Sequence, residues 1–280
     1  MLSGILVPGI LAVLTEAPVR AQDPFRSGAE ARDISPEVYS AFQEFFCAGR
    51  YNHSREQLEL ALQASPDEPM VYALLAALSY QEGDLEAFTE QGAQTLAAAS
   101  ELTATDPLRG HLYEAVGYGF EAANRVLQDG VVIGLPKALP TLNNLFGAIR
   151  QAQKVNAQDP ELNLLNGYMD LLLTNRDKAL EQFQLAGPDY MAYRGLALAY
   201  RDLQQYDQAI DAVDQALTSG CDNPEFVYLK AQILVLQGND AEALPLFNQA
   251  LEAADQLPSP LVSQIESERD SAERRMAAGS

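Results

Sequence analysis

Two glutamates, Glu114 and Glu121, come nearest to a catalytic pair, because a spacing of seven residues places both side chains on one face of a helix. A pair of carboxylates is what glycoside hydrolysis requires, with one group acting as the acid. The chain has 39 acidic residues among 280, however, and two glutamates on a helix usually form part of a solvated stripe. An acidic helix face is therefore the basis of one enzyme hypothesis, which the abundance of acidic residues disfavours.

Other patterns of catalytic or metal-binding residues are missing from the sequence. It contains two histidines, His53 and His111, and no recognisable motif places a nucleophile or a carboxylate beside either of them. It contains no HExxH, CxxC or Walker motif. The stretch "GYGFEA" from Gly117 matches part of a dinucleotide fingerprint, but no strand precedes it, and small packing residues explain it better. We therefore expect no catalytic residue, no metal site and no cofactor.

The composition indicates a folded protein and excludes one class of partner. Hydrophobic residues make up 48% of the chain, which is too apolar for a disordered protein. The formal net charge is −21, so the surface carries a field of one sign that repels a phosphate backbone. We expect no nucleic-acid partner.

The first 21 residues are typical of a secretory signal peptide. An apolar run from Leu2 to Leu14 precedes Val19-Arg20-Ala21, where small residues stand at the positions that a signal peptidase requires, although no basic residue precedes Arg20. Cleavage there would leave Gln22 first, which is not a cysteine, so no lipid anchor is expected. These residues predict an exported protein of the periplasm or a lumenal space, with a flexible segment at 22–34 in front of the folded part.

Two stretches near the C-terminal end repeat the same pattern. In "QYDQAIDAVDQALTSG" and "NDAEALPLFNQALEAA", Ala209 corresponds to Ala243 and Ala216 to Ala250, in each case 34 residues later. Within each stretch a large residue lies between the two alanines: Val213 in the first stretch and Phe247 in the second. Such a unit of two helices exposes an apolar stripe that only a neighbouring copy can cover, and the small residues let the neighbour approach closely.

A period of 34 residues with this order of small and large residues resembles the tetratricopeptide repeat. The resemblance implies an all-α, right-handed superhelical solenoid of about six helical hairpins over 35–257. The third unit is irregular, with an apolar insertion at 129–140, and residues 258–280 are expected to form a capping helix with a frayed tail. The recognisable units begin at Ser35, Pro69, Pro160, Tyr190 and Pro224.

The resemblance also implies a concave groove lined by the first helix of each hairpin. The basic and amide residues with which some family members bind a carboxylate terminus are missing from the first units, so we expect an amphipathic helix or an extended apolar segment as the ligand. Arg194 and Arg201 are expected to receive an acidic group. Packing of the tyrosines against adjacent helices is the alternative, and the 129–140 insertion is a second possible binding element. The predicted groove residues are Tyr39, Gln43, Phe46, Tyr80, Tyr118, Leu164, Tyr168, Arg194, Leu198, Arg201, Tyr228 and Gln232.

These observations predict a monomeric, non-enzymatic scaffold or assembly factor that binds a protein or peptide in its groove. Two alternatives stay open: an enzyme or enzyme subunit that uses Glu114 and Glu121, and a structural envelope component that binds other proteins by its outer faces. Cys47 and Cys221 are expected to be free thiols, because several repeats along a rod would separate them beyond the roughly 7 Å between Cα atoms that a disulfide tolerates.

Overall fold

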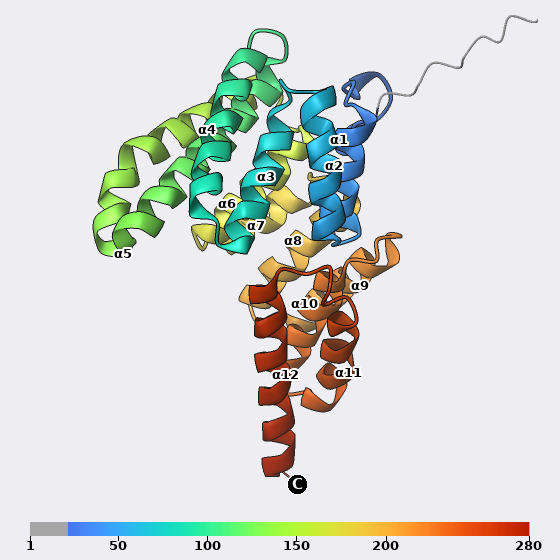
Figure 1. Cartoon of the computed structure of the whole chain (residues 1–280). Helices are drawn as coiled ribbons and strands as arrows, with labels where there is room; N and C mark the ends of the chain where they lie inside the picture. The colour runs from blue at the N-terminus through green and yellow to red at the C-terminus, as the bar shows by residue number, and fades with distance from the viewer. Residues whose placement is uncertain (1–21, 280) are drawn as a thin grey trace, which may run out of the picture.

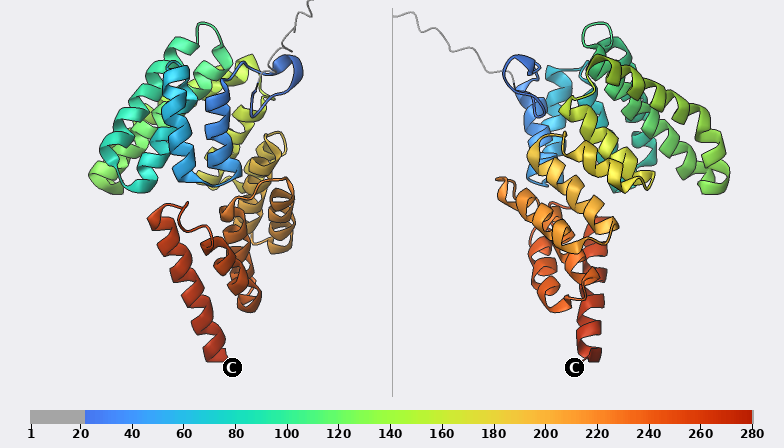
Figure 2. Two further views of the ribbon diagram at one scale, coloured as in Figure 1. Left: turned by 45° about the vertical axis from the view of Figure 1, so that its right-hand side comes forward. Right: turned by 180° about the vertical axis from the view of Figure 1, so that it is seen from behind.

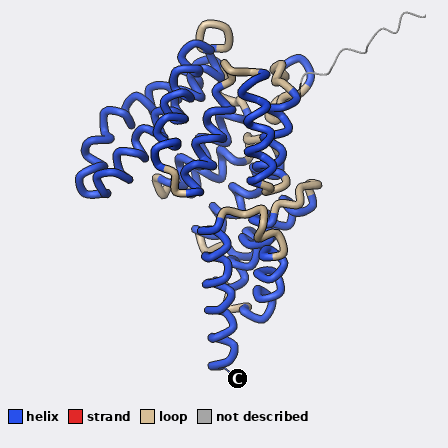
Figure 3. The backbone as a smooth tube through the Cα atoms, viewed as in Figure 1, coloured by secondary structure: helices blue, strands red, loops and turns tan. Residues whose placement is uncertain are grey.

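A computed structural model describes residues 22–279, and no strand occurs among them. The tube in Figure 3 shows helices joined by short loops along this whole part of the chain. The predicted signal peptide, residues 1–21, lies outside the described residues. None of the described helices has the length and hydropathy needed to span a bilayer.

Six helical hairpins follow one another and a single helix closes the array, which confirms the predicted all-α superhelical repeat fold (Figure 1). The third hairpin is the long helix α5, whose two arms meet at a kink, and α12 is the closing helix. A short 3-10 turn (Gly28–Glu30) precedes α1, and a π-helical turn (Gln43–Cys47) follows it. The helices are α1 (Pro36–Phe42), α2 (Tyr51–Ala64), α3 (Pro69–Glu82), α4 (Leu85–Leu102), α5 (Pro107–Val155), α6 (Pro160–Leu172), α7 (Arg176–Phe183), α8 (Asp189–Asp202), α9 (Tyr206–Thr218), α10 (Pro224–Leu236), α11 (Asp240–Leu251) and α12 (Ser259–Gly279).

Most hairpins begin with the same local signal. A proline occupies the first position of α1, α3, α5, α6 and α10, where its missing N–H costs no hydrogen bond. A polar side chain before the proline accepts a backbone N–H of the first turn, as Asp106 does from Arg109 and Asp159 from Leu162. These signals are readable in the sequence and explain why the helices start where the repeat predicts.

The repeated alanines have equivalent surroundings. Ala209 and Ala243 are both fully buried, and so are Val213 and Phe247. Glycines at other small positions are required by close packing: a Cβ atom at Gly195 would lie 2.3 Å from the Phe183 ring. The small residues therefore let neighbouring helices touch, as the repeat pattern predicts.

The expected apolar loop at 129–140 is wrong, because this stretch is helical. The first arm of α5 runs to Gly130, whose φ of 74° and ψ of 165° reverse the chain, and the second arm begins at the next residue. A Cβ atom at Gly134 would lie 2.5 Å from the Arg125 carbonyl oxygen, so a glycine is needed where the two arms meet. One glycine in a left-handed conformation is enough to make the turn, and no long loop is required.

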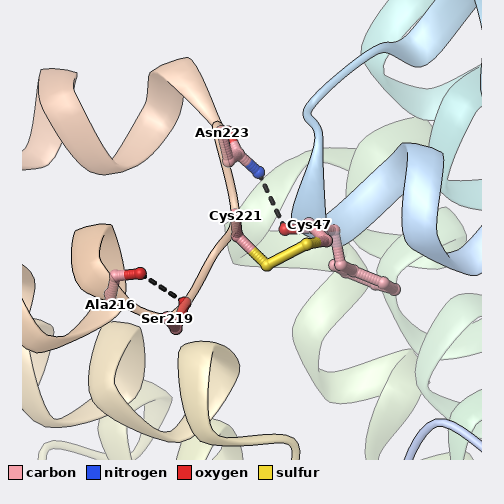
Figure 4. Close-up of a disulfide and its surroundings, with 6 residues drawn as sticks. Cys47, Ala216, Ser219, Cys221 and Asn223 are labelled. Carbon is pink, nitrogen blue, oxygen red and sulfur yellow. Dashed lines mark hydrogen bonds between the residues drawn. A yellow bond between two sulfur atoms is a disulfide. The ribbon is translucent and has the colours of Figure 1, made fainter.

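The expectation of two free thiols is also wrong. Cys47 is the last residue of the π-helical turn that follows α1, and Cys221 lies in the loop between α9 and α10. The two form a disulfide, and their Cα atoms lie 4.7 Å apart (Figure 4). Beside it, the Asn223 amide donates a hydrogen bond to the Phe46 carbonyl at 2.9 Å. The array curves so strongly that the sixth hairpin returns to the first, as the blue and orange helices in Figure 2 show. The distance expected between the two cysteines was too long because it assumed a straight rod of repeats.

We call this contact between the first hairpin and the segments around α10 the closing seam; its residues are Cys47, Gly49, Tyr51 and Asn52 on one side and Cys221, Asn223, Glu225, Asp255 and Gln256 on the other. The Tyr51 backbone N–H donates to the Gln256 carbonyl at 3.2 Å, and the Asn52 amide donates to the Asp255 carbonyl at 2.9 Å. A Cβ atom at Gly49 would lie 2.6 Å from the Asn223 side chain, so the two sides touch without space for another atom.

The segment at 22–34, which the sequence predicts to be flexible, is fastened to the body of the protein. The Arg26 side chain is 2% exposed and pairs with Asp159 at 2.7 Å and with Glu161 at 2.9 Å. Arg32 pairs with Asp106 at 2.8 Å. These partners lie far away in the sequence, so no local pattern reveals them.

Candidate functional site

Two adjoining apolar cavities lie among the first helices of the hairpins, and α4 and the second arm of α5 complete the wall of the outer one. The inner cavity has a volume of about 260 Å³ and the outer one about 730 Å³, and Ala77 and Phe120 line both. We call them together the apolar groove. Its inner part is lined by Phe25, Phe42, Phe46, Met70, Ala73, Leu74, Ala77, Leu112, Tyr113, Val116, Phe120, Glu161, Leu164, Leu165, Tyr168 and Met191. Its outer part is lined by Ala77, Tyr80, Gln81, Phe88, Gly119, Phe120, Ala122, Ala123, Val126, Leu127, Leu135, Ala138, Leu142, Met169 and Leu172.

Small residues open the groove and large ones form its walls. Ala73 and Ala77 on α3 leave room along its middle, since longer side chains there would fill it. Tyr80 is 52% exposed and Leu172 is 77% exposed at the outer end. An exposed apolar surface of this kind, inside a concavity, is typical of a binding site for an apolar ligand.

A cluster of buried charges closes the inner end of the groove. The Tyr113 hydroxyl donates to Glu161 at 2.7 Å, and Arg26 pairs with the same carboxylate at 2.9 Å. Arg109, 4% exposed, pairs with Glu68 at 2.7 Å. Burial alone would lower the pKa of Arg26, but Glu161 and its other acidic neighbours raise that pKa above its ordinary value. These charges face one another and fasten the N-terminal segment to α6, so their arrangement serves the structure.

Four of the predicted groove residues line the apolar groove. Phe46, Leu164 and Tyr168 belong to its inner part, and Tyr80 belongs to its outer part. They come from the first, second and fourth hairpins, and the groove brings them to one side of the molecule. Their role in binding stays a prediction.

Arg201 and Gln232 lie in a separate cavity of about 330 Å³ beside the capping helix α12. The Gln232 amide donates to the Tyr228 hydroxyl at 2.8 Å and to Glu268 of α12 at 3.0 Å. Arg201 pairs with the adjacent Asp202 at 2.9 Å. Arg201 and Gln232, which were predicted from the last two hairpins, therefore do not line the apolar groove.

The remaining predicted groove residues make contacts inside the protein. Arg194 donates to the Tyr168 hydroxyl at 3.0 Å and pairs with Glu225 at 3.3 Å. Leu198 and Tyr228 pack against the main core, and Tyr118 packs against a small second core between α5 and α6. Tyr39 and Gln43 lie beside Tyr190 of α8. For these residues, packing against neighbouring helices describes the structure better than an open groove.

The repeat positions give the wrong face of α5. They predict Tyr118 as the groove residue of this unit, whereas Val116 and Phe120 form the wall. The apolar character of these two was visible in the sequence, but the repeat assigns them to the buried face. The first arm of α5, from Pro107 to Gly130, is longer than the first helix of any other described hairpin, so the family spacing does not apply to this unit.

Each of the two glutamates behind the enzyme hypothesis is bound to a neighbour on its own helix. Glu114 lies 2.8 Å from the His111 ring, and Glu121 pairs with Arg125 at 2.6 Å. The Thr141 hydroxyl also donates to Glu121 at 3.2 Å. Among residues 22–279, no group of three or more histidine, cysteine or acidic residues is arranged to hold a metal ion.

Comparison with solved structures finds helical repeat proteins of low sequence identity. A chain of the APC/C hetero-tetramer Cut9–Hcn1 is 16% identical, with a TM-score of 0.48, over 84% of this chain and 42% of its own length. A tetratricopeptide repeat protein from Parabacteroides merdae is 15% identical, with a TM-score of 0.45, over 85% of this chain and 86% of its own. The TPR2AB domain of yeast Sti1, solved in complex with pHSP90, is 15% identical, with a TM-score of 0.37, over 85% of this chain and 97% of its own.

These structural likenesses carry no argument about function at such scores, and this chain spans less than half the length of the first of them. No curated protein matches the chain. The tetratricopeptide-repeat family model matches residues 173–220 and 194–258. The resemblance of the chain to tetratricopeptide-repeat proteins is therefore supported by a family match that extends from α7 to α11.

Proposed function

We propose that the protein is a non-enzymatic scaffold or assembly factor that holds an apolar or amphipathic polypeptide segment in the apolar groove. The observation that carries this proposal is the outer part of the groove, a cavity of about 730 Å³ whose walls are almost entirely apolar and which opens at Tyr80 and Leu172. An amphipathic helix that places one apolar face in a groove is a common mode of peptide recognition.

The enzyme alternative receives less support. Glu114 and Glu121 are each paired with a neighbouring side chain, so neither is an unpartnered carboxylate that faces the groove. The alternative of a component that binds other proteins by its outer faces stays open.

We infer further that the protein works outside the reducing cytosol, in a periplasm or a lumenal space. The apolar N-terminal stretch and the Cys47–Cys221 disulfide both support this, because disulfides persist mainly in oxidising compartments. A fusion of residues 1–30 to a reporter enzyme that is active only after export tests the inference. Reporter activity is expected, and its absence would contradict export.

The groove proposal is tested by two exposed residues whose loss should not disturb folding. The double variant Tyr80→Ala with Leu172→Ser removes apolar surface from the outer groove. We expect the polypeptide that co-purifies with the full chain from its own compartment to be recovered at least tenfold less, while circular dichroism stays the same. The control is Leu60→Ser with Leu185→Ser, which removes two exposed leucines outside the groove. Equal recovery with both double variants would contradict the proposal.

A further inference from the structure

The turn between the two arms of α5 exposes an unusual run of aliphatic residues. Val131 is 66% exposed, Val132 is 89% exposed and Ile133 is 57% exposed. Leu135 and Leu139, further along the second arm, are 46% and 54% exposed. Figures 1 and 2 place this turn at one lateral extreme of the molecule, at the lower left in Figure 1. We call these five residues the α5 tip.

The geometry of the α5 tip fits a fluid surrounding better than a protein surface. Successive residues of a helix point about 100° apart, so Val131, Val132 and Ile133 face three different directions. A partner protein covers one stripe of a helix, with apolar residues three or four positions apart, as Val131, Leu135 and Leu139 are. Val132 and Ile133 lie off this stripe, so a single helix-covering contact would leave them exposed. An apolar surface on all sides of a helix end is covered most completely by hydrocarbon that can flow around it.

Charge separates this region from the rest of the protein. Residues 121–140, which include the tip, contain two acidic residues, Glu121 and Asp129, and two basic ones, Arg125 and Lys137. Each acid is paired with one of the bases: Glu121 with Arg125 at 2.6 Å and Asp129 with Lys137 at 3.0 Å. This region therefore has a formal net charge of zero, whereas the whole chain carries −21. The α5 tip can approach a lipid surface without the repulsion from anionic headgroups that the acidic faces meet.

We propose that the α5 tip inserts into the interfacial layer of a lipid bilayer and attaches the protein to the membrane surface. The aliphatic side chains enter the boundary of the acyl chains, to a depth of about 5–10 Å as for other interfacial helices. The ion pairs Glu121–Arg125 and Asp129–Lys137 stay at the level of the lipid headgroups, because the long stems of the two basic side chains can lie along apolar surface with the charges in water. Leu135 also lines the outer part of the apolar groove, whereas Val131, Val132, Ile133 and Leu139 lie outside it. The proposal assigns a function to these four residues, which the groove leaves unused.

A probe at the α5 tip tests insertion directly. Val132→Cys in the full chain provides a free thiol for the environment-sensitive dye NBD, while Cys47 and Cys221 stay in their disulfide. With vesicles of four parts phosphatidylcholine and one part phosphatidylglycerol, we expect a blue shift of the dye and quenching by lipids that carry a spin label on the acyl chain. Leu60→Cys, a site on α2 with 50% exposure, is the matched control and should show neither change.

Three outcomes would overturn the proposal: no spectral change at position 132, an equal change at position 60, or a blue shift at position 132 that is already present without vesicles. The last would mean that a second copy of the chain covers the tip. Vesicle flotation provides an independent measurement. The apolar N-terminal residues are the same in every variant, so a difference in flotation is due to the substituted site. Val131→Asp with Ile133→Asp should reduce the floated fraction at least fivefold relative to Leu60→Asp, and equal flotation would contradict insertion.

Discussion

At the scale of single residues, Glu225 in the closing seam has the most unusual environment for an acid. The Tyr51 hydroxyl donates a hydrogen bond to it from the first hairpin, and Arg194 lies 3.3 Å away on the other side. Burial raises the pKa of Glu225 to about 7 from an ordinary value of 4.5. The folded protein therefore holds a proton there at pH values at which the unfolded chain has released it.

This pKa predicts the direction in which pH affects stability. Between about pH 4.5 and pH 7 the folded state binds the proton and the unfolded state does not, so this residue's contribution to the free energy of unfolding falls as pH rises. The fall should amount to about 2 kcal/mol over that range. In Glu225→Gln this contribution disappears. The free energy of unfolding of the variant should therefore rise relative to that of wild type between pH 4.5 and pH 7. Urea unfolding followed by circular dichroism measures it.

Glu59→Gln, at an exposed position of α2, is the control for this measurement and should follow the wild type at each pH. A stability difference between Glu225→Gln and wild type that does not change with pH would contradict the raised pKa.

At the scale of elements, the hairpins are held together by close contact between helices at small residues. Gly167 of α6 and Gly195 of α8 both face the ring of Phe183 in α7, which is 1% exposed. A Cβ atom would lie 2.5 Å from the ring at Gly167 and 2.3 Å from it at Gly195. Three helices therefore meet at one aromatic side chain, with no room for a methyl group.

Gly195→Ala should lower the free energy of unfolding by about 1 to 3 kcal/mol, because the added methyl group forces the helices apart. This loss should exceed the gain in helix propensity that alanine normally brings. Gly119→Ala is the matched control: it lies within α5, and the nearest atom to its added Cβ is 3.6 Å away, at ordinary contact distance. If the two variants unfold at the same urea concentration, the packing argument is wrong.

The elements also show what the sequence could and could not predict. Helix starts were predictable because their cause is local, as at Asp159 and Pro160. The helical turn at Gly130 was not, since a glycine between apolar residues is equally typical of a loop. The groove wall of α5 was missed because the family spacing was applied to a unit of different length. The attachment of Arg26 to Asp159 depends on a contact across the fold, which no sequence pattern records.

At the scale of the whole molecule, the disulfide turns an open array into a closed one. Cys47 and Cys221 enclose 174 positions of sequence, so the unfolded chain loses much conformational freedom when they are joined. Cys47→Ser with Cys221→Ser should lower the free energy of unfolding by about 3 to 5 kcal/mol, as measured in urea without reductant. The same loss should follow when wild type is unfolded with reductant, and the double variant should not respond to reductant. A double variant as stable as the oxidised wild type would contradict this role of the disulfide.

The central claim is that the apolar groove holds a polypeptide, and a photo-crosslinker placed inside it tests this most directly. Benzoylphenylalanine at Tyr80 lies in the outer groove, whereas the same group at Leu60 lies on the outer face of α2. After irradiation in the protein's own compartment, we predict one polypeptide joined to position 80 and not to position 60. If position 80 gives no crosslink, or if both positions give the same products, the groove is not where this protein binds its partner.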